Sequence, residues 1–242
     1  MKFHIYLQAR VNSTRFPKKI LKKIHGKTIF EILVNRLHQV SNAEIFLITG
    51  PISLNNELIQ EARRMNISFF SGDENNVLNR FYNASKQFSS QNIIRITGDC
   101  PLIDFELINS GVKIFSDKKI DFLLNYLPRT YPHGFDFEIF KSTALENSRN
   151  IIYDENDKNT FSSTFINPVQ NMIISKNLVH YYLKNNIDNS HIRLTLDYPD
   201  DFKLISLIYE KLNVQNQYFT SSEILNLLKI EPKLLDINKR FV

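Results

Sequence analysis

The sequence has a single cysteine and no long apolar run. Cys100 is the one cysteine among 242 residues, which excludes an intramolecular disulfide framework and a zinc site built from several cysteines. No stretch approaches the roughly 20 apolar residues that a membrane-spanning helix needs. The opening MKFHIYLQAR lacks the long apolar core and small-residue cleavage site of a secretory signal. We therefore expect a soluble, cytoplasmic protein that acts without a membrane.

The excess of positive charge is also small. The chain has 30 Lys and Arg against 25 Asp and Glu, a formal net charge of +5. A nucleic-acid-binding protein usually carries a larger excess on one face, so no nucleic-acid partner is expected. The one dense basic run comprises Lys18, Lys19, Lys22, Lys23 and Lys27. It is either a solvated surface or, because Arg10 and Arg15 precede it, part of a site for a small polyanion.

Glycine is scarce. The chain has 6 glycines, where average usage near 7% would give about 17. Gly50, Gly72 and Gly98 each follow an apolar segment, and a glycine at the end of a strand lets the backbone approach a bound ligand closely. Ordinary turn formation explains Gly26 and Gly50 adequately. Gly72 and Gly98 therefore mark candidate positions in a nucleotide site.

Short apolar runs alternate with amphipathic patterns through the first half of the chain. The runs that predict buried strands are Phe3–Leu7, Ile45–Thr49, Ile67–Phe70, Ile93–Thr97 and Ile120–Leu124. Apolar residues at helical spacing lie between them, and this alternation predicts an α/β fold with a largely parallel sheet. Ligands bind beyond the carboxyl ends of such strands. The loops after Leu7, Gly72 and Thr97 are therefore the candidate binding loops.

The second half is less regular. Strand-like runs span Phe135–Phe140, Pro168–Ser175 and Ile192–Leu196. The apolar spacing after Pro199 predicts a helix, and Thr220 begins a capping box before another. No linker or internal repeat divides the chain, so we predict a single domain over residues 1–242. The segment 127–190 is predicted to be an insertion that carries substrate or partner contacts.

The segment after the first predicted strand is rich in side chains that suit phosphate. It has the sequence QARVNSTRFPKK. Arginine offers forked donors to phosphate oxygens, and lysine offers a compact charge to a departing pyrophosphate. The segment is neither a Walker A loop nor a dinucleotide fingerprint. Arg10, Arg15 and Lys19 are the candidates for phosphate contact, and the remaining lysines suit a solvated surface.

Two further segments place an aspartate at the end of a predicted strand. In RITGDCPLID, Asp99 is a candidate Mg²⁺ ligand, because Mg²⁺ prefers one or two carboxylates together with phosphate oxygens and water. Asp104 is predicted to cap the next helix, and Cys100 to be a small buried packing residue. In RLTLDYPDDF, Asp197 is a candidate second metal ligand. Alternatively, Asp197 or Tyr198 caps the helix that follows, and Asp200 and Asp201 suit its first turn electrostatically.

Five segments together resemble one known family. QARVNSTRFPKKIL, SGDENNVLNRFYNAS, RITGDCPLID, PRTYPHGFDFEIF and LTLDYPDDFKLI are similar, in order and spacing, to the cytidylyltransferases of the spore-coat polysaccharide biosynthesis protein F (SpsF) type. These proteins are related to the CMP-3-deoxy-manno-octulosonate and CMP-acylneuraminate synthetases. The resemblance covers nearly the whole chain, including the closing EPKLLDINK.

The resemblance implies a fold and a reaction. The fold would be a Rossmann-like nucleotidyltransferase of the glycosyltransferase-A kind, a three-layer α/β/α sandwich around a mixed, mainly parallel sheet, usually in a homodimer. The reaction would be Mg²⁺-dependent transfer of CMP from CTP to an acidic sugar, with release of pyrophosphate, in the synthesis of a surface polysaccharide. The segment 127–190 would be the sugar-binding or dimerisation insertion.

The resemblance also implies roles for individual residues. The catalytic residues would be Arg10, Arg15, Lys19 and Asp99. The nucleotide would contact Leu7, Gln8, Ala9, Arg10, Ser13, Arg15, Lys19, Gly72, Asp73, Thr97 and Gly98. The sugar would contact Tyr131, His133, Gly134 and Asp136, and Mg²⁺ would be held by Asp99 and Asp197. The base that accepts the proton of the sugar hydroxyl is left open between His133 and a metal-held water.

This sequence departs from the family pattern in three places. Asn12 and Lys18 stand where the family commonly has glycine. Asparagine tolerates positive φ, so Asn12 is expected to keep the turn, whereas the loop is expected to be reshaped at Lys18. The segment Thr160–Thr164 replaces a Glu-His-Val-Thr-Pro stretch, a change that bears on sugar specificity or on a dimer contact.

Two other functions remain open. A glycosyltransferase of the same general fold would use a nucleotide-sugar donor and typically needs an Asp-x-Asp motif after a strand. Residues 117–121 offer none, and Asp136-Phe137-Glu138 only approximates one. The other alternative is a non-catalytic nucleotide-binding homologue. The phosphate-binding and acidic candidates that the chain retains favour an active enzyme.

Overall fold

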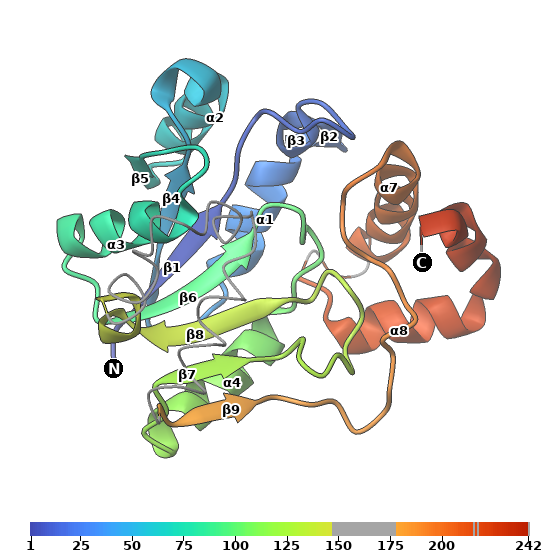
Figure 1. Cartoon of the computed structure of the whole chain (residues 1–242). Helices are drawn as coiled ribbons and strands as arrows, with labels where there is room; N and C mark the ends of the chain where they lie inside the picture. The colour runs from blue at the N-terminus through green and yellow to red at the C-terminus, as the bar shows by residue number, and fades with distance from the viewer. Residues whose placement is uncertain (147–177, 215, 217, 242) are drawn as a thin grey trace, which may run out of the picture.

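A mixed sheet of seven strands organises the molecule in the computed structural model, which describes residues 1–146, 178–214, 216 and 218–241 (Figure 1). The strand order is β5-β4-β1-β6-β8-β7-β9. The strands are β1 Phe3–Gln8, β4 Ala43–Thr49, β5 Ser68–Ser71, β6 Asn92–Thr97, β7 Phe122–Leu124, β8 Phe137–Lys141 and β9 His180–Tyr182. The first four in spatial order are parallel, and β8 runs antiparallel to both of its neighbours.

Alternating side chains of the strands enter two separate apolar clusters, one on each face of the sheet. In β1, Ile5 and Leu7 belong to the larger cluster and Tyr6 to the smaller one. The larger cluster is covered by α1 Ile29–Leu37, α2 Ile52–Arg64, α4 Phe105–Asp117, α7 Pro199–Asn213 and α8 Ser221–Ile230. The smaller is covered by α3 Val77–Gln87. The three-layer α/β/α arrangement predicted from the sequence is therefore confirmed.

The helix ends follow local sequence signals. Asp104 accepts hydrogen bonds from the backbone N–H groups of Glu106 and Ser221, both near 2.9 Å, so one carboxylate caps α4 and ties it to the start of α8. Thr220 and Glu223 form the predicted capping box of α8, and Pro199 opens α7 as predicted. The capping interpretation of Asp104 is confirmed.

The strand predicted at Ile192–Leu196 is wrong. Its backbone joins no strand of the sheet; Leu194 donates to the carbonyl of His133, and Leu196 donates to that of Asp99. Ile192, Leu194 and Leu196 are buried, so the segment has the alternating pattern of a strand. It is a loop whose hydrogen bonds go to the loops that contain His133 and Asp99. The strand predicted at Pro168–Ser175 and the segment Thr160–Thr164 lie outside the described residues.

The basic run forms local structure that the sequence pattern did not predict. After a short 3-10 helix, η1 Lys19–Leu21, the strands β2 Lys23–Ile24 and β3 Lys27–Thr28 form a small hairpin. Lys18 has φ 55, the left-handed conformation that favours glycine, and Asn12 is not among the residues with positive φ. The positive φ expected at Asn12 is therefore wrong, and the reshaping expected at Lys18 stays a prediction.

The described ends of the predicted insertion, 127–146 and 178–190, contribute two strands to the main sheet, β8 and β9. The further 3-10 segments, η2 Pro232–Ile237 and η3 Lys239–Phe241, follow α8 and return the chain toward α7. No helix among the described residues is long and apolar enough to cross a membrane.

Candidate active site

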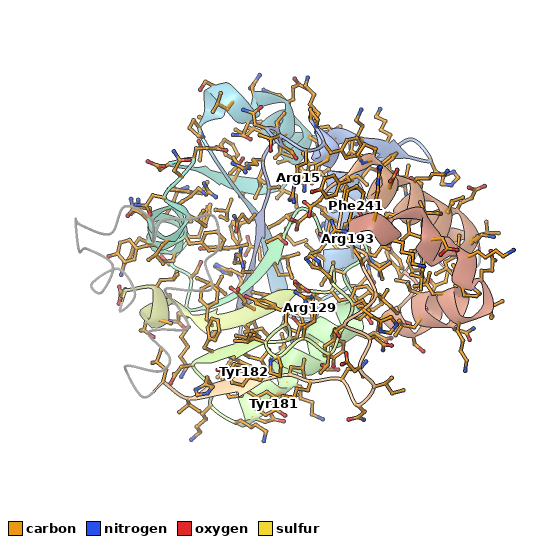
Figure 2. All side chains as sticks on the ribbon, turned by 45° about the vertical axis from the view of Figure 1, so that its right-hand side comes forward. Arg15, Arg129, Tyr181, Tyr182, Arg193 and Phe241 are labelled. Atoms are coloured by element: carbon orange, nitrogen blue, oxygen red, sulfur yellow. The ribbon has the colours of Figure 1, made fainter. Side chains whose placement is uncertain are left out.

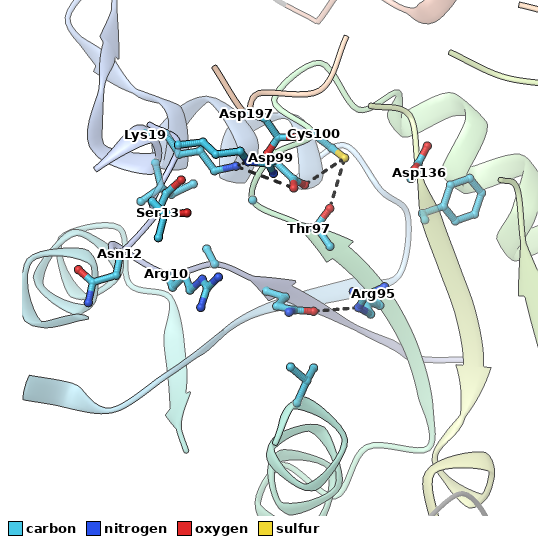
Figure 3. A pocket seen from close by; sticks show the side chains of 18 of the residues that line it. Arg10, Asn12, Ser13, Lys19, Arg95, Thr97, Asp99, Cys100, Asp136 and Asp197 are labelled. Carbon is cyan, nitrogen blue, oxygen red and sulfur yellow. Dashed lines mark hydrogen bonds and ion pairs between the residues drawn. The ribbon is translucent and has the colours of Figure 1, made fainter. Parts of the chain in front are cut away.

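A cavity of about 860 Å³ opens at the carboxyl ends of β1 and β6 (Figure 3). The three loops predicted to bind ligand all reach it. Of the predicted site residues, it is lined by Gln8, Ala9, Arg10, Ser13, Arg15, Lys19, Thr97, Gly98, Asp99, His133, Asp136 and Asp197. Among the described residues, six cationic side chains and four carboxylates face it, so the cavity suits an anionic ligand.

The loop after β1 is held close to the end of β6. A Cβ added to Gly98 would lie 2.9 Å from Cβ of Ala9 and 3.2 Å from Cδ1 of Ile20, so glycine allows the two loops to approach. The side chain of Asn55 accepts a hydrogen bond from the backbone of Val11 at 2.9 Å. The left-handed Lys18 then starts η1, which turns Lys19 into the cavity.

Asp197 forms ion pairs with three described cationic side chains. Its Oδ1 lies 2.7 Å from Arg15 and 3.0 Å from Nζ of Lys19, and its Oδ2 lies 3.2 Å from Arg193. Burial of the carboxyl opposes its ionisation. The charge and hydrogen bond of Lys19, the charge of Arg15 and the hydrogen bond of Arg193 outweigh burial and hold the pKa of Asp197 below its ordinary 3.8. Asp197 is therefore a strongly stabilised carboxylate.

Asp99 and Asp197 converge on the same ammonium group. Lys19 Nζ lies 3.9 Å from Asp99 Oδ2 as well as 3.0 Å from Asp197 (Figure 3). The Asp99 carbonyl accepts bonds from the Thr195 hydroxyl and the Leu196 amide, and these bonds bring the two aspartates together. Two carboxylates that approach the same ammonium group, beside a cavity lined by cationic side chains, are a donor set that fits Mg²⁺. The described residues contain no group of three or more metal-binding side chains.

Tyr198 is the N-cap of α7, as one alternative predicted, and Asp201, rather than Asp197, supplies the capping carboxylate. Its Oδ2 accepts from the amides of Asp197 and Tyr198, both at 2.9 Å. Arg193 donates a hydrogen bond to each oxygen of Asp201, at 3.0 and 2.9 Å, and Asn238 donates a further one at 2.8 Å. The alternative reading of Asp197 as a helix cap is therefore wrong, and its carboxylate is available to the cavity.

Aromatic rings support the cations beside Asp197. Figure 2 shows Arg15, Arg193 and Phe241 gathered beside the C-terminal helices. Both guanidiniums lie over the ring of Tyr198, at 5.1 and 5.8 Å, and Phe241 stacks on that ring at 3.8 Å. The end of the described chain therefore packs on the Tyr198 ring, which also lies against two of the side chains that contact Asp197.

The opposite wall of the cavity carries a second ion pair. Arg129 donates two bonds to Asp136, at 2.6 and 2.7 Å. Nδ1 of His133 lies 3.5 Å from a terminal nitrogen of Arg193. Burial lowers the pKa of His133; the charge of Asp136 acts against this, and those of Arg129 and Arg193 add to it. His133 is therefore a neutral ring in this wall.

The sequence matches the family model described as Cytidylyltransferase over residues 5–225. This chain belongs to the cytidylyltransferase family. As a member, it is a nucleotidyltransferase, and the predicted nucleotidyltransferase fold is confirmed. The SpsF protein of Bacillus subtilis is 25% identical over 231 residues, 93% of each chain, which confirms the resemblance to the SpsF type.

Two further proteins are similar to this cytidylyltransferase along its length. An uncharacterized protein of Methanocaldococcus jannaschii is 30% identical over 242 residues, which cover 98% of this chain and 95% of that protein. The structure of a cytidylyltransferase from Leptospira borgpetersenii serovar Hardjo-bovis matches with a TM-score of 0.86 and 27% identity, over 97% of both chains.

Five predicted contact residues of the cytidylyltransferase do not line the cavity: Leu7, Gly72, Asp73, Tyr131 and Gly134. Leu7 is fully buried in the core. The Asp73 carboxylate accepts from the amides of Asn75 and Asn76 and shapes its own loop. Gly134, at φ +114, packs against the backbone of Leu194. Asp73 and Gly134 therefore shape loops that reach the cavity.

The floor of the cytidylyltransferase cavity contains a buried polar network that was not predicted from the sequence. Arg95 donates to Gln8 and to Glu138, both at 2.9 Å, and the Tyr126 hydroxyl also donates to Glu138. Burial raises the pKa of Glu138, an effect that Arg95 opposes. Polar residues in the predicted strands 93–97 and 135–140 were the available signal, but their pairing depends on the register of β6 with β8.

Glu74 was missed as well. It faces the cavity and pairs with Arg10 at 2.9 Å. A Cβ on Gly50 would lie 1.7 Å from its second carboxylate oxygen, so this glycine leaves room for the Glu74 side chain. Cys100 reaches the cavity wall but is 2% exposed, which confirms its interpretation as a buried packing residue, and burial raises the pKa of its thiol.

Proposed function

We propose that this protein is a Mg²⁺-dependent cytidylyltransferase that transfers CMP from CTP to an acidic sugar and releases pyrophosphate, in the synthesis of a surface polysaccharide. The proposal includes a homodimer, which the family resemblance implies. It also includes a cytoplasmic location, where nucleoside triphosphates are available.

One observation carries the proposal. Arg10, Arg15 and Lys19 from the loop after β1 line the same cavity as Asp99 and Asp197 from two other loops. Cationic side chains next to paired carboxylates in one cavity match a triphosphate that arrives with a divalent cation. Lys19 lies where both groups meet.

The protein's contribution to this reaction is positioning and charge neutralisation. In-line attack of a sugar hydroxyl on the α-phosphorus needs little covalent participation by the enzyme. Arg15 and Lys19 would stabilise the charge that develops on the departing pyrophosphate. Mg²⁺ held by Asp99 and Asp197 would polarise and orient the α-phosphate.

The wall with Arg129, His133 and Asp136 is the proposed sugar subsite. Arginine and lysine have no acceptor atoms, so the contact from Arg193 leaves Nδ1 of His133 as the acceptor and places the ring hydrogen on Nε2. His133 would therefore donate a hydrogen bond to the sugar, which disfavours it as the base. Asp136 forms an ion pair with Arg129, and its carboxylate oxygens would also accept hydrogen bonds from sugar hydroxyls.

Pyrophosphate release from CTP tests the proposal. The purified protein is incubated with CTP, Mg²⁺ and a panel of eight- and nine-carbon keto-deoxy sugar acids, with neutral hexoses as controls, and the CMP-sugar is identified by mass. We expect product with one of the acids and none with neutral sugars. Asp99→Ala should abolish turnover, and Lys18→Ala should retain it. Turnover of UTP in preference to CTP, or near-normal activity of Asp99→Ala, would contradict the proposal.

The homodimer is tested separately. Light scattering of the purified protein should give about twice the chain mass of 28.4 kDa. A mass equal to one chain at micromolar concentration would remove the dimer from the proposal and leave the proposed reaction unaffected.

A further inference from the structure

The three cations around Asp197 differ in how firmly they are held. Arg193 is 8% exposed, donates to both oxygens of Asp201, and its carbonyl accepts from Asn238. The side chain of Arg15 is 52% exposed, and its described ion pair is the one with Asp197. Arg15 also lies over the Tyr198 ring, at 5.1 Å. Arg193 is therefore fixed by the fold, whereas Arg15 can leave Asp197 without breaking any other described ion pair.

Lys19 is intermediate. It donates to Asp197 and to the carbonyl of Leu196 at 2.6 Å, and its ammonium faces the cavity. Arg15 and Lys19 both contact Oδ1 of Asp197, while Arg193 contacts Oδ2. One oxygen of the carboxylate is thus covered by the two cations nearest the cavity, and the other by the fixed cation.

This arrangement disfavours a metal ion in the protein without nucleotide. A divalent cation on Oδ1 would lie beside an ammonium and a guanidinium, and like charges at such distances repel. A polyphosphate changes this balance, because its oxygens are stronger partners for both side chains than a carboxylate that they already share with Arg193.

We infer that Arg15 and Lys19 are exchangeable counter-cations of Asp197, which transfer to the polyphosphate and so expose Oδ1 to a divalent cation only when nucleotide is bound. This inference rests on the proposed function, because it uses the proposed metal ligands. Arg193 stays on Oδ2 throughout and keeps the carboxylate in place. Metal and nucleotide then bind together rather than in either order.

Mn²⁺ binding, measured from the paramagnetic resonance signal of the free ion, tests the inference without any turnover. In the absence of nucleotide, we expect Arg15→Ala to bind Mn²⁺ several-fold more tightly than the wild type, and Arg15→Ala/Lys19→Met at least tenfold more tightly. Adding Asp197→Asn should abolish the gain. CTP should recruit Mn²⁺ to the wild-type protein, detected as enhanced water proton relaxation.

Lys18→Ala is the matched control. It removes one positive charge next to Lys19, but Lys18 pairs with Glu57 on the surface at 2.6 Å, so its Mn²⁺ affinity should equal that of the wild type. The same gain in Lys18→Ala would mean a general charge effect and overturn the inference. Wild-type protein that binds Mn²⁺ without nucleotide as tightly as the variants would also overturn it.

These outcomes are separable from a failure of the proposed function. If the wild type bound no CTP, the proposed function would be wrong, while the nucleotide-free comparison of wild type and Arg15→Ala would still decide whether Arg15 blocks Asp197. Thermal unfolding of each variant verifies that it is folded, and Arg15→Ala, at an exposed position, keeps the test valid if the double variant does not fold.

Discussion

Arg193 and Asp201 form a buried ion pair with two contacts, at 3.0 and 2.9 Å, directly behind the carboxylate of Asp197. Asp201 is fully buried, and it accepts from Asn238 and from two backbone amides at the start of α7. A single carboxylate thus connects the end of the described chain, a helix cap and the guanidinium that holds Asp197.

Asp201→Asn should destabilise the protein strongly. The substitution leaves Arg193 with less charge compensation in a buried position, and loss of one partner of a buried pair costs about 3–5 kcal/mol. Because Arg193 keeps Asp197, we expect the lower end, about 3 kcal/mol, in the free energy of unfolding by urea. Asp200→Asn is the matched control; its partner Arg240 is exposed, so it should cost less than about 1 kcal/mol. Equal effects would contradict the account.

Lys19→Ala should slow catalysis more than it weakens binding of CMP. The ammonium is assigned to the phosphates that leave, so its loss removes charge stabilisation in the transition state, worth about 10²–10³-fold in kcat. Calorimetry should show weaker binding of CTP and little change for CMP. Equal losses of affinity for the two nucleotides would show that Lys19 contacts the phosphate that is transferred.

Gly134→Ala should destabilise the protein more than Gly26→Ala does. Both glycines have positive φ, +114 and +79, which costs any other residue about 1 kcal/mol or more. A Cβ on Gly134 would lie 2.5 Å from the carbonyl carbon of Leu194, whereas one on Gly26 meets nothing within 4 Å. The difference between the two midpoints of thermal unfolding reports the steric contact together with the less favourable φ at Gly134. A smaller effect of Gly134→Ala than of Gly26→Ala would contradict this prediction.

His133 should titrate below the ordinary histidine pKa of 6.5. Burial, with Arg129 and Arg193, lowers its pKa and keeps the ring neutral at pH 7. The unfolded chain then binds the proton more readily, so this residue's contribution to stability falls as the pH drops below about 6.5. Nuclear magnetic resonance of the ring gives the midpoint, and His133→Gln should remove this part of the pH dependence. A midpoint above 6.5 would contradict the neutral assignment.

The sheet and the binding loops were predictable because local patterns determine them. The runs Phe3–Leu7 and Ile93–Thr97 are strands within one residue of their predicted bounds, and parallel topology brings their ends together. Ile192–Leu196 has the same alternation, but its partners are the loops at His133 and Asp99. The local pattern of apolar residues does not show which distant segments the backbone of this one bonds to.

In the candidate site as well, some residues could be predicted from local motifs, whereas others depend on tertiary contacts. Arg15, Lys19, Asp99 and Asp197 were identified from motifs and face one cavity. The Arg95–Glu138 pair depends on the antiparallel register of β6 and β8. Asp201 caps α7 through a local capping box with Tyr198, but its contacts with Arg193 and Asn238 are tertiary. One sequence does not encode such tertiary contacts locally.

The most direct test of the central claim, that this cavity binds CTP with Mg²⁺, is thermal unfolding with CTP, UTP, ATP and GTP, each with Mg²⁺ and with a chelator. A ligand at 100 times its Kd adds about 2.7 kcal/mol, and each kcal/mol raises the midpoint by about 2–4 °C in a protein of this size. The account predicts a Mg²⁺-dependent rise that is largest for CTP. No rise with any nucleotide, or a rise with UTP alone, would contradict it.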